Sequence, residues 1–178
     1  NIKRHFEKFR AVITSENGPY GLNRPREEYF FQGTKIMSSR KCAIPTFTYT
    51  DFDCYVSRAF FSIKSNRIDL KYLTGILNSK LVVFWLRHKG KMQGFQYQVD
   101  KDPIINIPIA LTNEIQPFVS LMDYILFLKS NVTDKINDYV SNEHIIQSFE
   151  EVLNAFVYEL YFAEHMKEKE IDVLRFAK

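Results

Sequence analysis

The stretch from residue 70 to residue 87 restricts the fold of this chain more than any other segment. Leucine, isoleucine, valine, phenylalanine and tryptophan occupy positions around most of the helical circumference rather than a single stripe. A helix with that pattern is buried on most of its sides. Asp69 precedes the stretch and suits an N-cap, because its carboxylate can accept hydrogen bonds from the first free N–H groups. We therefore expect a buried helix over residues 70–87.

A basic segment punctuated by glycines follows this helix directly. Residues 88–94 read His-Lys-Gly-Lys-Met-Gln-Gly, and residues 95–109 continue to the sequence Asn-Ile-Pro-Ile. We expect the first part to form a loop and the second part to form a short strand. Cations and amides on a loop held by a rigid apolar support suit the binding of a polyanion.

The other segments predict a mixture of helices and strands, so the predicted fold class is α+β. Strands are expected over residues 34–42, 46–50 and 55–64. Helices are expected over residues 2–10, 26–31, 114–129 and 143–162. In the second strand, Phe47 and Tyr49 share one face, which we interpret as the core side. The last two helices are expected to pair as an antiparallel hairpin.

Charge divides the chain near residue 110. Residues 1–110 hold 18 Lys and Arg against 9 Asp and Glu, a net +9, whereas residues 111–178 hold 6 against 12, a net −6. We interpret residues 1–110 as a unit that faces phosphates. Residues 111–178 are then a helical region that packs on this unit or on other domains. The alternative is that the basic side chains only keep the surface soluble.

The sequence lacks the motifs of common active sites. It has no dinucleotide-binding fingerprint, phosphate-binding glycine loop or nucleophile elbow, and its histidines are scattered. Asp51 and Asp53 flank Phe52, which we interpret as a turn that caps its own backbone rather than a catalytic carboxylate pair. Cys42 and Cys54 do not have the paired spacing of a zinc site. We therefore expect no catalytic residue, metal or cofactor on this chain itself.

The sequence also bears on location. No apolar run is long enough to span a membrane, and the first residues lack the core of a signal peptide. Two cysteines are too few for a secreted disulfide scaffold, so we expect both to be reduced in the cytoplasm. Because the chain does not begin with methionine, we expect it to be a fragment of a longer protein.

The candidate binding residues are long cations and glutamines in loops or at strand ends. The cations, which suit contacts with a phosphate backbone, are Arg24, Arg26, Arg40, Lys41, Lys89, Lys91 and Lys101. The glutamines are Gln93, Gln96 and Gln98, and a glutamine can both donate to and accept from an adenine in the major groove. An ordinary exposed strand face explains the glutamines equally well. For Phe95 and Tyr97, a core position is favoured over stacking on an unpaired base.

Several segments, in this order, resemble the TaqI-like C-terminal specificity domain of type IIG restriction-modification enzymes and related adenine-specific DNA methyltransferases. They are Phe6-Glu-Lys-Phe-Arg-Ala-Val-Ile-Thr-Ser, Gly21-Leu-Asn-Arg-Pro-Arg-Glu-Glu, Lys35-Ile, Tyr72-Leu-Thr-Gly-Ile-Leu-Asn-Ser-Lys-Leu, the Lys89-Gly to Gly94 loop, Asn106-Ile-Pro-Ile and Phe156-Val-Tyr-Glu-Leu-Tyr-Phe. The resemblance is strong over residues 3–110 and weaker over residues 145–165. The order and spacing of the segments carry it, because each motif alone is unspecific.

The resemblance implies a bacterial target recognition domain, a mixed α/β module that holds double-stranded DNA against a methyltransferase domain. The family's Asn-Pro-Pro-Tyr catalytic motif is absent from this sequence. Methyl transfer, with S-adenosylmethionine, is therefore expected on an upstream domain of the same polypeptide. Magnesium is expected there as well if the parent enzyme cleaves DNA.

Two other classes of function stay open. An RNA-binding or single-strand-binding module would need aromatic side chains exposed on a sheet. A helical interaction scaffold would act through the acidic residues 111–178, and the basic surface would then be incidental.

Overall fold

The computed structural model describes residues 2–21, 26–130 and 140–177. Its helices are α1 (Ile2–Glu7), α2 (Leu70–Leu77), α3 (Lys80–Lys89), α4 (Lys101–Ile105), α5 (Gln116–Ser130), α6 (Asn142–Tyr161) and α7 (Ala163–Glu168), with short helical turns η1 (Glu28–Phe30) and η2 (Leu174–Ala177). Its strands are β1 (Thr14–Ser15), β2 (Gly18–Pro19), β3 (Lys35–Ser39), β4 (Lys41–Cys42), β5 (Phe47–Thr50), β6 (Phe60–Ile63), β7 (Lys91–Gln93) and β8 (Gln96–Gln98). The small sheets are antiparallel and the helices are separate from them, which confirms the α+β class.

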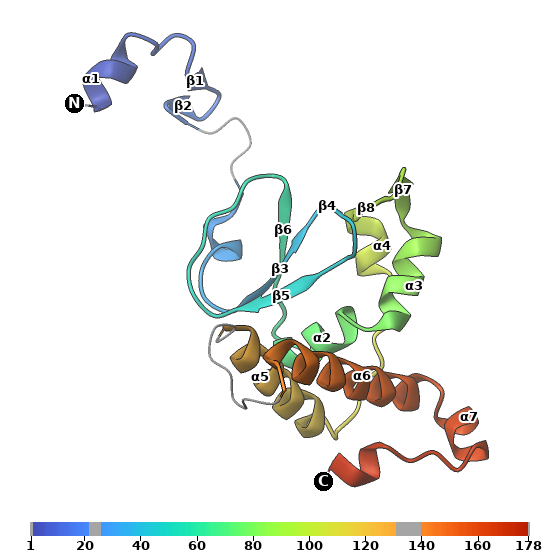
Figure 1. Ribbon diagram of the computed structural model, residues 1–178. Helices are drawn as coiled ribbons and strands as arrows, with labels where there is room; N and C mark the ends of the chain where they lie inside the picture. The colour runs from blue at the N-terminus through green and yellow to red at the C-terminus, as the bar shows by residue number, and fades with distance from the viewer. Residues whose placement is uncertain (1, 22–25, 131–139, 178) are drawn as a thin grey trace.

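The described strands form three sheets, with the strand orders β1-β2, β5-β3-β6 and β4-β8-β7. Figure 1 shows the two larger sheets above α2, α5 and α6 below it, and α3 and α4 to the side near β8. The segment with α1, β1 and β2 stands apart from this body, and none of its described side chains is buried. The core therefore lies between the sheets and the long helices.

Helix α2 is the most deeply buried element. All six residues from Tyr72 to Leu77 are buried. The four large apolar ones, Tyr72, Leu73, Ile76 and Leu77, belong to the same hydrophobic core as Phe47 of β5 and Phe118 of α5. Gly75 allows the close approach of the long helices. A Cβ atom on this residue would lie 3.1 Å from Cδ1 of Leu153, which is on α6. The expected burial is therefore confirmed for residues 72–77. It is wrong for the second half of the expected helix, because only Val82 and Leu86 of α3 are buried and Phe84 is 61% exposed.

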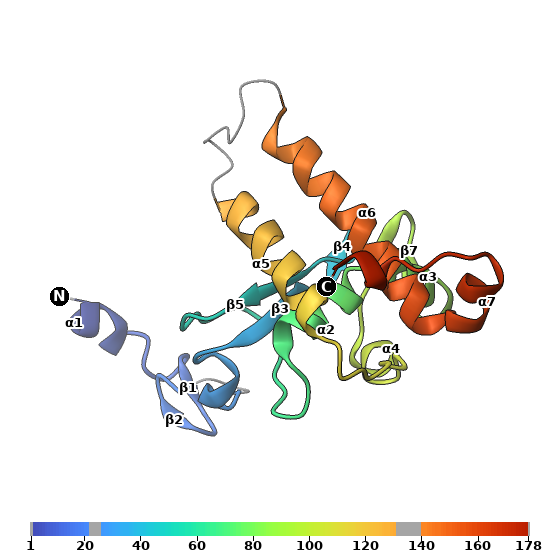
Figure 2. The same cartoon turned by 90° about the horizontal axis from the view of Figure 1, so that it is seen from below.

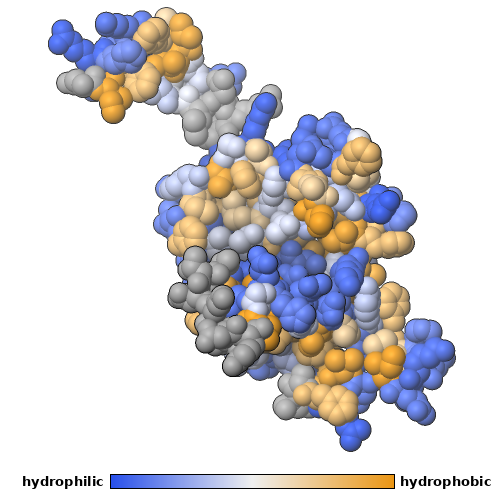
Figure 3. Space-filling model, viewed as in Figure 1, coloured by the Kyte–Doolittle hydropathy of each residue, from blue (hydrophilic) through white to orange (hydrophobic). Residues whose placement is uncertain are grey.

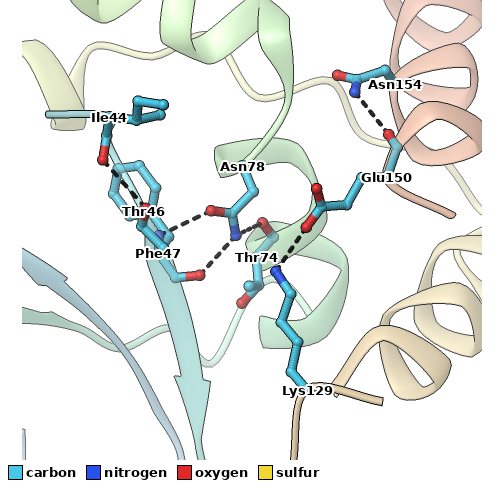
Figure 4. Close-up of polar contacts among 8 residues, drawn as sticks. All are labelled: Ile44, Thr46, Phe47, Thr74, Asn78, Lys129, Glu150 and Asn154. Atoms are coloured by element: carbon cyan, nitrogen blue, oxygen red, sulfur yellow. Dashed lines mark hydrogen bonds and ion pairs between the residues drawn. The ribbon is translucent and has the colours of Figure 1, made fainter. Parts of the chain in front are cut away.

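The single helix expected over residues 70–87 is, however, wrong in its continuity. It breaks after Leu77, because the side chains of Asn78 and Ser79 make hydrogen bonds to backbone groups that compete with the hydrogen bonds of a continuous helix. The Asn78 side chain donates to the carbonyls of Thr74 and Phe47 at 2.9 and 2.7 Å, and accepts from the Phe47 N–H at 2.9 Å. Figure 4 shows this bridge between α2 and the edge strand β5. The Ser79 hydroxyl then caps α3.

A second correction concerns the strand expected over residues 34–42. It divides into β3 and β4, which belong to different sheets. The division falls at Arg40, whose N–H donates to the Ala59 carbonyl at 2.8 Å and whose carbonyl accepts from the Val99 N–H at 2.7 Å. The backbone of Arg40 therefore connects the residue before β6 in one sheet to the residue after β8 in the other.

The segment after α3 differs most from expectation. The loop expected over residues 88–94 is the end of α3 followed by β7. The short strand expected to end in Asn106-Ile-Pro-Ile ends instead at Gln98 as β8, and α4 follows it. Pro103 does not prevent α4, because it lies in the first helical turn, where its missing N–H has no intrahelical partner. Near the N-terminus, β1 and β2 pair with each other, and the expected strand 55–64 begins only at Phe60.

Helices α5 and α6 form the expected antiparallel hairpin (Figure 2). The ring of Phe118, near the start of α5, lies 5.3 Å from the ring of Phe156, near the end of α6. At the other end of the pair, Lys129 Nζ lies 2.7 Å from Glu150 Oε1. Phe118 also contacts Tyr72 of α2, so core contacts cross residue 110. The division of the chain into two units at that residue stays a prediction.

Two tyrosine hydroxyls hold the segment that connects α4 to α5. Tyr72 donates to the Ala110 carbonyl at 2.7 Å. Tyr161 donates to the Pro108 carbonyl at 2.7 Å and accepts from the Ala110 N–H at 3.0 Å.

We expect Tyr72→Phe to lower the free energy of unfolding by about 1–3 kcal/mol, because the Ala110 carbonyl loses its buried partner. Urea denaturation measures this. Tyr124→Phe is the matched control, since Tyr124 is 61% exposed and its variant should be neutral.

Stability at high pH tests the same contact independently. Burial raises the pKa of the Tyr72 hydroxyl from 10.0 to about 12. The folded state therefore holds this proton more tightly than the unfolded state, and the stabilisation is complete below pH 10 and is lost as pH rises towards about 12. We expect the free energy of unfolding to fall less steeply over this range in Tyr72→Phe than in the wild type. Equal slopes would contradict the role of Tyr72 burial.

Candidate nucleic-acid interface

The sheet β4-β8-β7 has one polar face built from lysines and glutamines. Lys41 on β4 and Lys91 on β7 both lie directly opposite Gln98 on β8, and Gln93 lies opposite Gln96. Opposed residues, and residues two apart on a strand, share a face of a sheet. These five side chains therefore lie on the same side, which we call the polar face.

The opposite side of this sheet is apolar and is attached to the core. Met92, Tyr97 and Cys42 lie in one cross-strand row. Tyr97 and Cys42 pack against the hydrophobic core, and burial raises the pKa of the Cys42 thiol. The core position expected for Tyr97 is thus confirmed. Because this side must face the core, the polar face must point outward.

Cations on and beside the polar face are accessible to a ligand. The Lys91 side chain is 75% exposed, and its Nζ lies 3.8 Å from a carboxylate oxygen of Asp100, too far for a strong ion pair. The same carboxylate accepts from Gln98 Nε2 at 3.2 Å. Lys41 is exposed, and Lys89 ends α3 with its Nζ 6.0 Å from the Trp85 ring. In Figure 3, the part of the surface over β7 and β8, at upper right, mixes hydrophilic and hydrophobic residues.

The remaining candidate residues divide between this region and others. Arg40 precedes Lys41 at the junction of the two sheets, and Lys101 is the first residue of α4. Arg26 is held at the start of β6, where its guanidinium donates to the Phe60 carbonyl at 3.2 Å. Arg24 lies outside the described residues. The candidate residues that the fold brings onto one face are thus Lys41, Lys91, Gln93, Gln96 and Gln98.

Phe95 contradicts its expected place in the core. It forms the turn between β7 and β8 with Gly94, and it is 98% exposed. Gly94 has a φ of 61°, a left-handed conformation that glycine adopts without steric cost. The signal that sequence reasoning missed is a two-residue turn between two short alternating segments. Such a turn places Phe95 at the tip of a hairpin, outside the alternation that gives Tyr97 its buried side.

Other polar groups in the described chain have structural explanations. Asp53 accepts from the Gly33 N–H at 2.6 Å, so it binds a backbone group twenty residues away rather than one of its own turn, as was expected. A cleft of about 560 Å³ lies between β5 and the long helices, where Lys129 and Glu150 pair with each other (Figure 4). Within the described ranges, no group of three or more His, Cys, Asp or Glu side chains is placed to hold a metal ion. No helix there is long and apolar enough to cross a membrane.

Comparison with known proteins agrees with the resemblance that the motifs predict. The model of one protein family, described as the TaqI-like C-terminal specificity domain, matches residues 4–109. This range begins in α1 and ends before α5, so it includes every strand described above. No curated protein matches the chain.

The turn at Gly94 should be sensitive to substitution. A Cβ atom there meets no other atom within 4 Å, so the only penalty is its positive φ. We expect Gly94→Ala to destabilise the hairpin by about 1 kcal/mol and Gly94→Asn to cost less, because asparagine tolerates this conformation better. Hydrogen exchange of the β7 and β8 amides measures the effect. Equal protection in Gly94→Ala and the wild type would contradict the assigned turn.

Proposed function

We propose, because the chain belongs to the family of TaqI-like C-terminal specificity domains, that it binds double-stranded DNA sequence-specifically as the target recognition domain of a restriction-modification enzyme. One observation carries the proposal, namely that the polar face of β4-β8-β7 holds two lysines and three glutamines in cross-strand register. The family match and this face support the same class of ligand independently.

The dimensions and chemistry of the hairpin β7-β8 suit a duplex. The major groove of B-form DNA admits a two-stranded ribbon, and the edges of its bases carry donors and acceptors that a glutamine amide can pair with. Gln93 and Gln96, opposite each other at the end of the ribbon, would reach these edges. Lys41 and Lys91 would neutralise phosphates and release counterions. Phosphate contacts would then position the hairpin, and glutamine contacts would discriminate bases.

The finer assignment is a type IIG restriction-modification enzyme or an adenine-specific DNA methyltransferase of a bacterial cytoplasm. In this proposal the chain is not catalytic by itself. A methyltransferase domain upstream in the same polypeptide holds S-adenosylmethionine, and magnesium serves a nuclease if the parent enzyme has one. The double-stranded DNA lies between that domain and the polar face.

A duplex is favoured over single-stranded DNA or RNA by the positions of the aromatic residues. A single-strand platform stacks successive bases on several exposed aromatic rings. Phe47 is buried and Tyr49 is half-buried, so the sheet β5-β3-β6 does not present them as a platform. Phe60 of β6 and Phe95 at the hairpin tip are exposed, but they belong to different sheets and so form no row of rings on one face.

Binding to duplexes at several salt concentrations tests the proposal. We expect Lys41→Ala and Lys91→Ala each to weaken binding of a duplex, and each to reduce the slope of log K against log salt by about 0.9 for a lost phosphate contact. Fluorescence anisotropy with a labelled duplex, a labelled single strand and a labelled RNA measures both effects. Lys169→Ala is the matched control, because Lys169 is exposed at the end of α7.

Three results would count against the proposal. The wild-type chain could fail to bind a duplex at low salt, or it could bind the single strand or the RNA more tightly. Equal salt slopes for Lys41→Ala, Lys91→Ala and Lys169→Ala would show that the polar face does not contact phosphates.

A further inference from the structure

The tip of the hairpin β7-β8 presents an aromatic side chain that contributes almost nothing to folding. Phe95 is 98% exposed, more than any other large hydrophobic residue of the described chain, while Tyr97 two positions later packs on the core. Burial of apolar surface stabilises the folded state, and the exposed Phe95 ring does not contribute to that stabilisation. Its surroundings are polar, because Gln93 and Gln96 form the last cross-strand pair before the turn.

The turn determines how far this side chain reaches. Gly94 and Phe95 are the only residues between the paired Gln93 and Gln96, so the ring lies at the extreme end of the ribbon. If the ribbon enters a major groove with its glutamines near the base edges, as the proposed function requires, Phe95 lies closest to the groove floor. A hydrophobic ring there needs an apolar contact to replace water.

The floor of the major groove offers one apolar group, the C5-methyl group of thymine, and phenylalanine is among the side chains that contact it. The other way to bury the ring is insertion between two bases, which requires unstacking at a cost of a few kcal/mol per step. Contact with a methyl group needs no distortion of the duplex. The methyl contact is therefore the favoured arrangement.

We propose that Phe95 is a specificity-determining residue that recognises thymine through its C5-methyl group. This inference rests on the proposed function and adds the identity of a base contact to it. Since Gln93 and Gln96 suit adenine, the hairpin tip as a whole selects A·T pairs. The predicted preference is local, at the one or two base pairs beneath the tip.

Parallel selections from two random duplex libraries test this inference whatever the target sequence is. The libraries are identical except that one contains thymine and the other uracil, which lacks only the methyl group. The full chain is used as the wild type, Phe95→Ala and Phe95→Leu. Phe176→Ala is the matched control, because Phe176 is 85% exposed in η2, near the C-terminus and far from the hairpin (Figure 1).

We expect the wild type and Phe176→Ala to enrich thymine at one or two positions in the first library and to lose this preference in the uracil library. On the recovered duplex, one thymine-to-uracil change should weaken wild-type binding about fourfold, the effect of about one buried methyl-sized group. Phe95→Ala should bind both duplexes equally, with an unchanged salt slope. Phe95→Leu should retain part of the preference. Equal midpoint temperatures of thermal unfolding for Phe95→Ala and the wild type would show that folding is unaffected.

The possible failures are distinguishable. Wild-type enrichment that is the same in both libraries overturns the thymine contact, and so does duplex binding with no enrichment. Neither result removes phosphate binding by Lys41 and Lys91. Absence of duplex binding overturns the proposed function itself. A rise in 2-aminopurine fluorescence that depends on Phe95 would show insertion between bases, and this also overturns the methyl contact.

Discussion

The burial of α2 is the constraint on which the rest of this structure depends. A helix whose residues Tyr72–Leu77 are all buried requires a sheet on one side and further helices on the other. The chain supplies β5-β3-β6 for the first and the α5-α6 hairpin for the second. Gly75 allows the helices to approach closely, and the Tyr72 hydroxyl holds the connection at Ala110. The basic residues 1–110 and the acidic residues 111–178 thus share one core.

This core also determines the direction of the polar face. Tyr97 and Cys42 attach the inner side of β4-β8-β7 to the core, so the lysines and glutamines on its other side face solvent. Hydrogen bonds also hold the chain where α2 ends and where α3 begins. Asn78 binds the backbone of Phe47, and the side-chain oxygen of Asn154 accepts from the N–H of Lys80 at 2.7 Å. Phe95, at the hairpin tip, is 98% exposed.

Much of the architecture could be predicted, and the failures have specific causes. The long helices α5 and α6 repeat apolar residues at spacings of three and four over many turns, which makes their signal strong. The division at Asn78 was missed because its partner, the Phe47 backbone, is distant in sequence. The division at Arg40 was missed for the same reason, since Ala59 and Val99 define it. Strands of two or three residues, such as β4, β7 and β8, are too short for alternation to identify.

The sequence by itself determined the α+β class, the buried helical region, the family and the residue types available for binding a polyanion. These properties depend on composition, periodicity and motif order, which are local or additive along the chain. Only the tertiary structure decided which of those residues share a face and that Phe95 lies outside the core. Alternation places Gln96 and Gln98 on one side of a strand, but it cannot say which side is buried. That choice depends on the packing of Tyr97 and Cys42 against side chains remote in sequence.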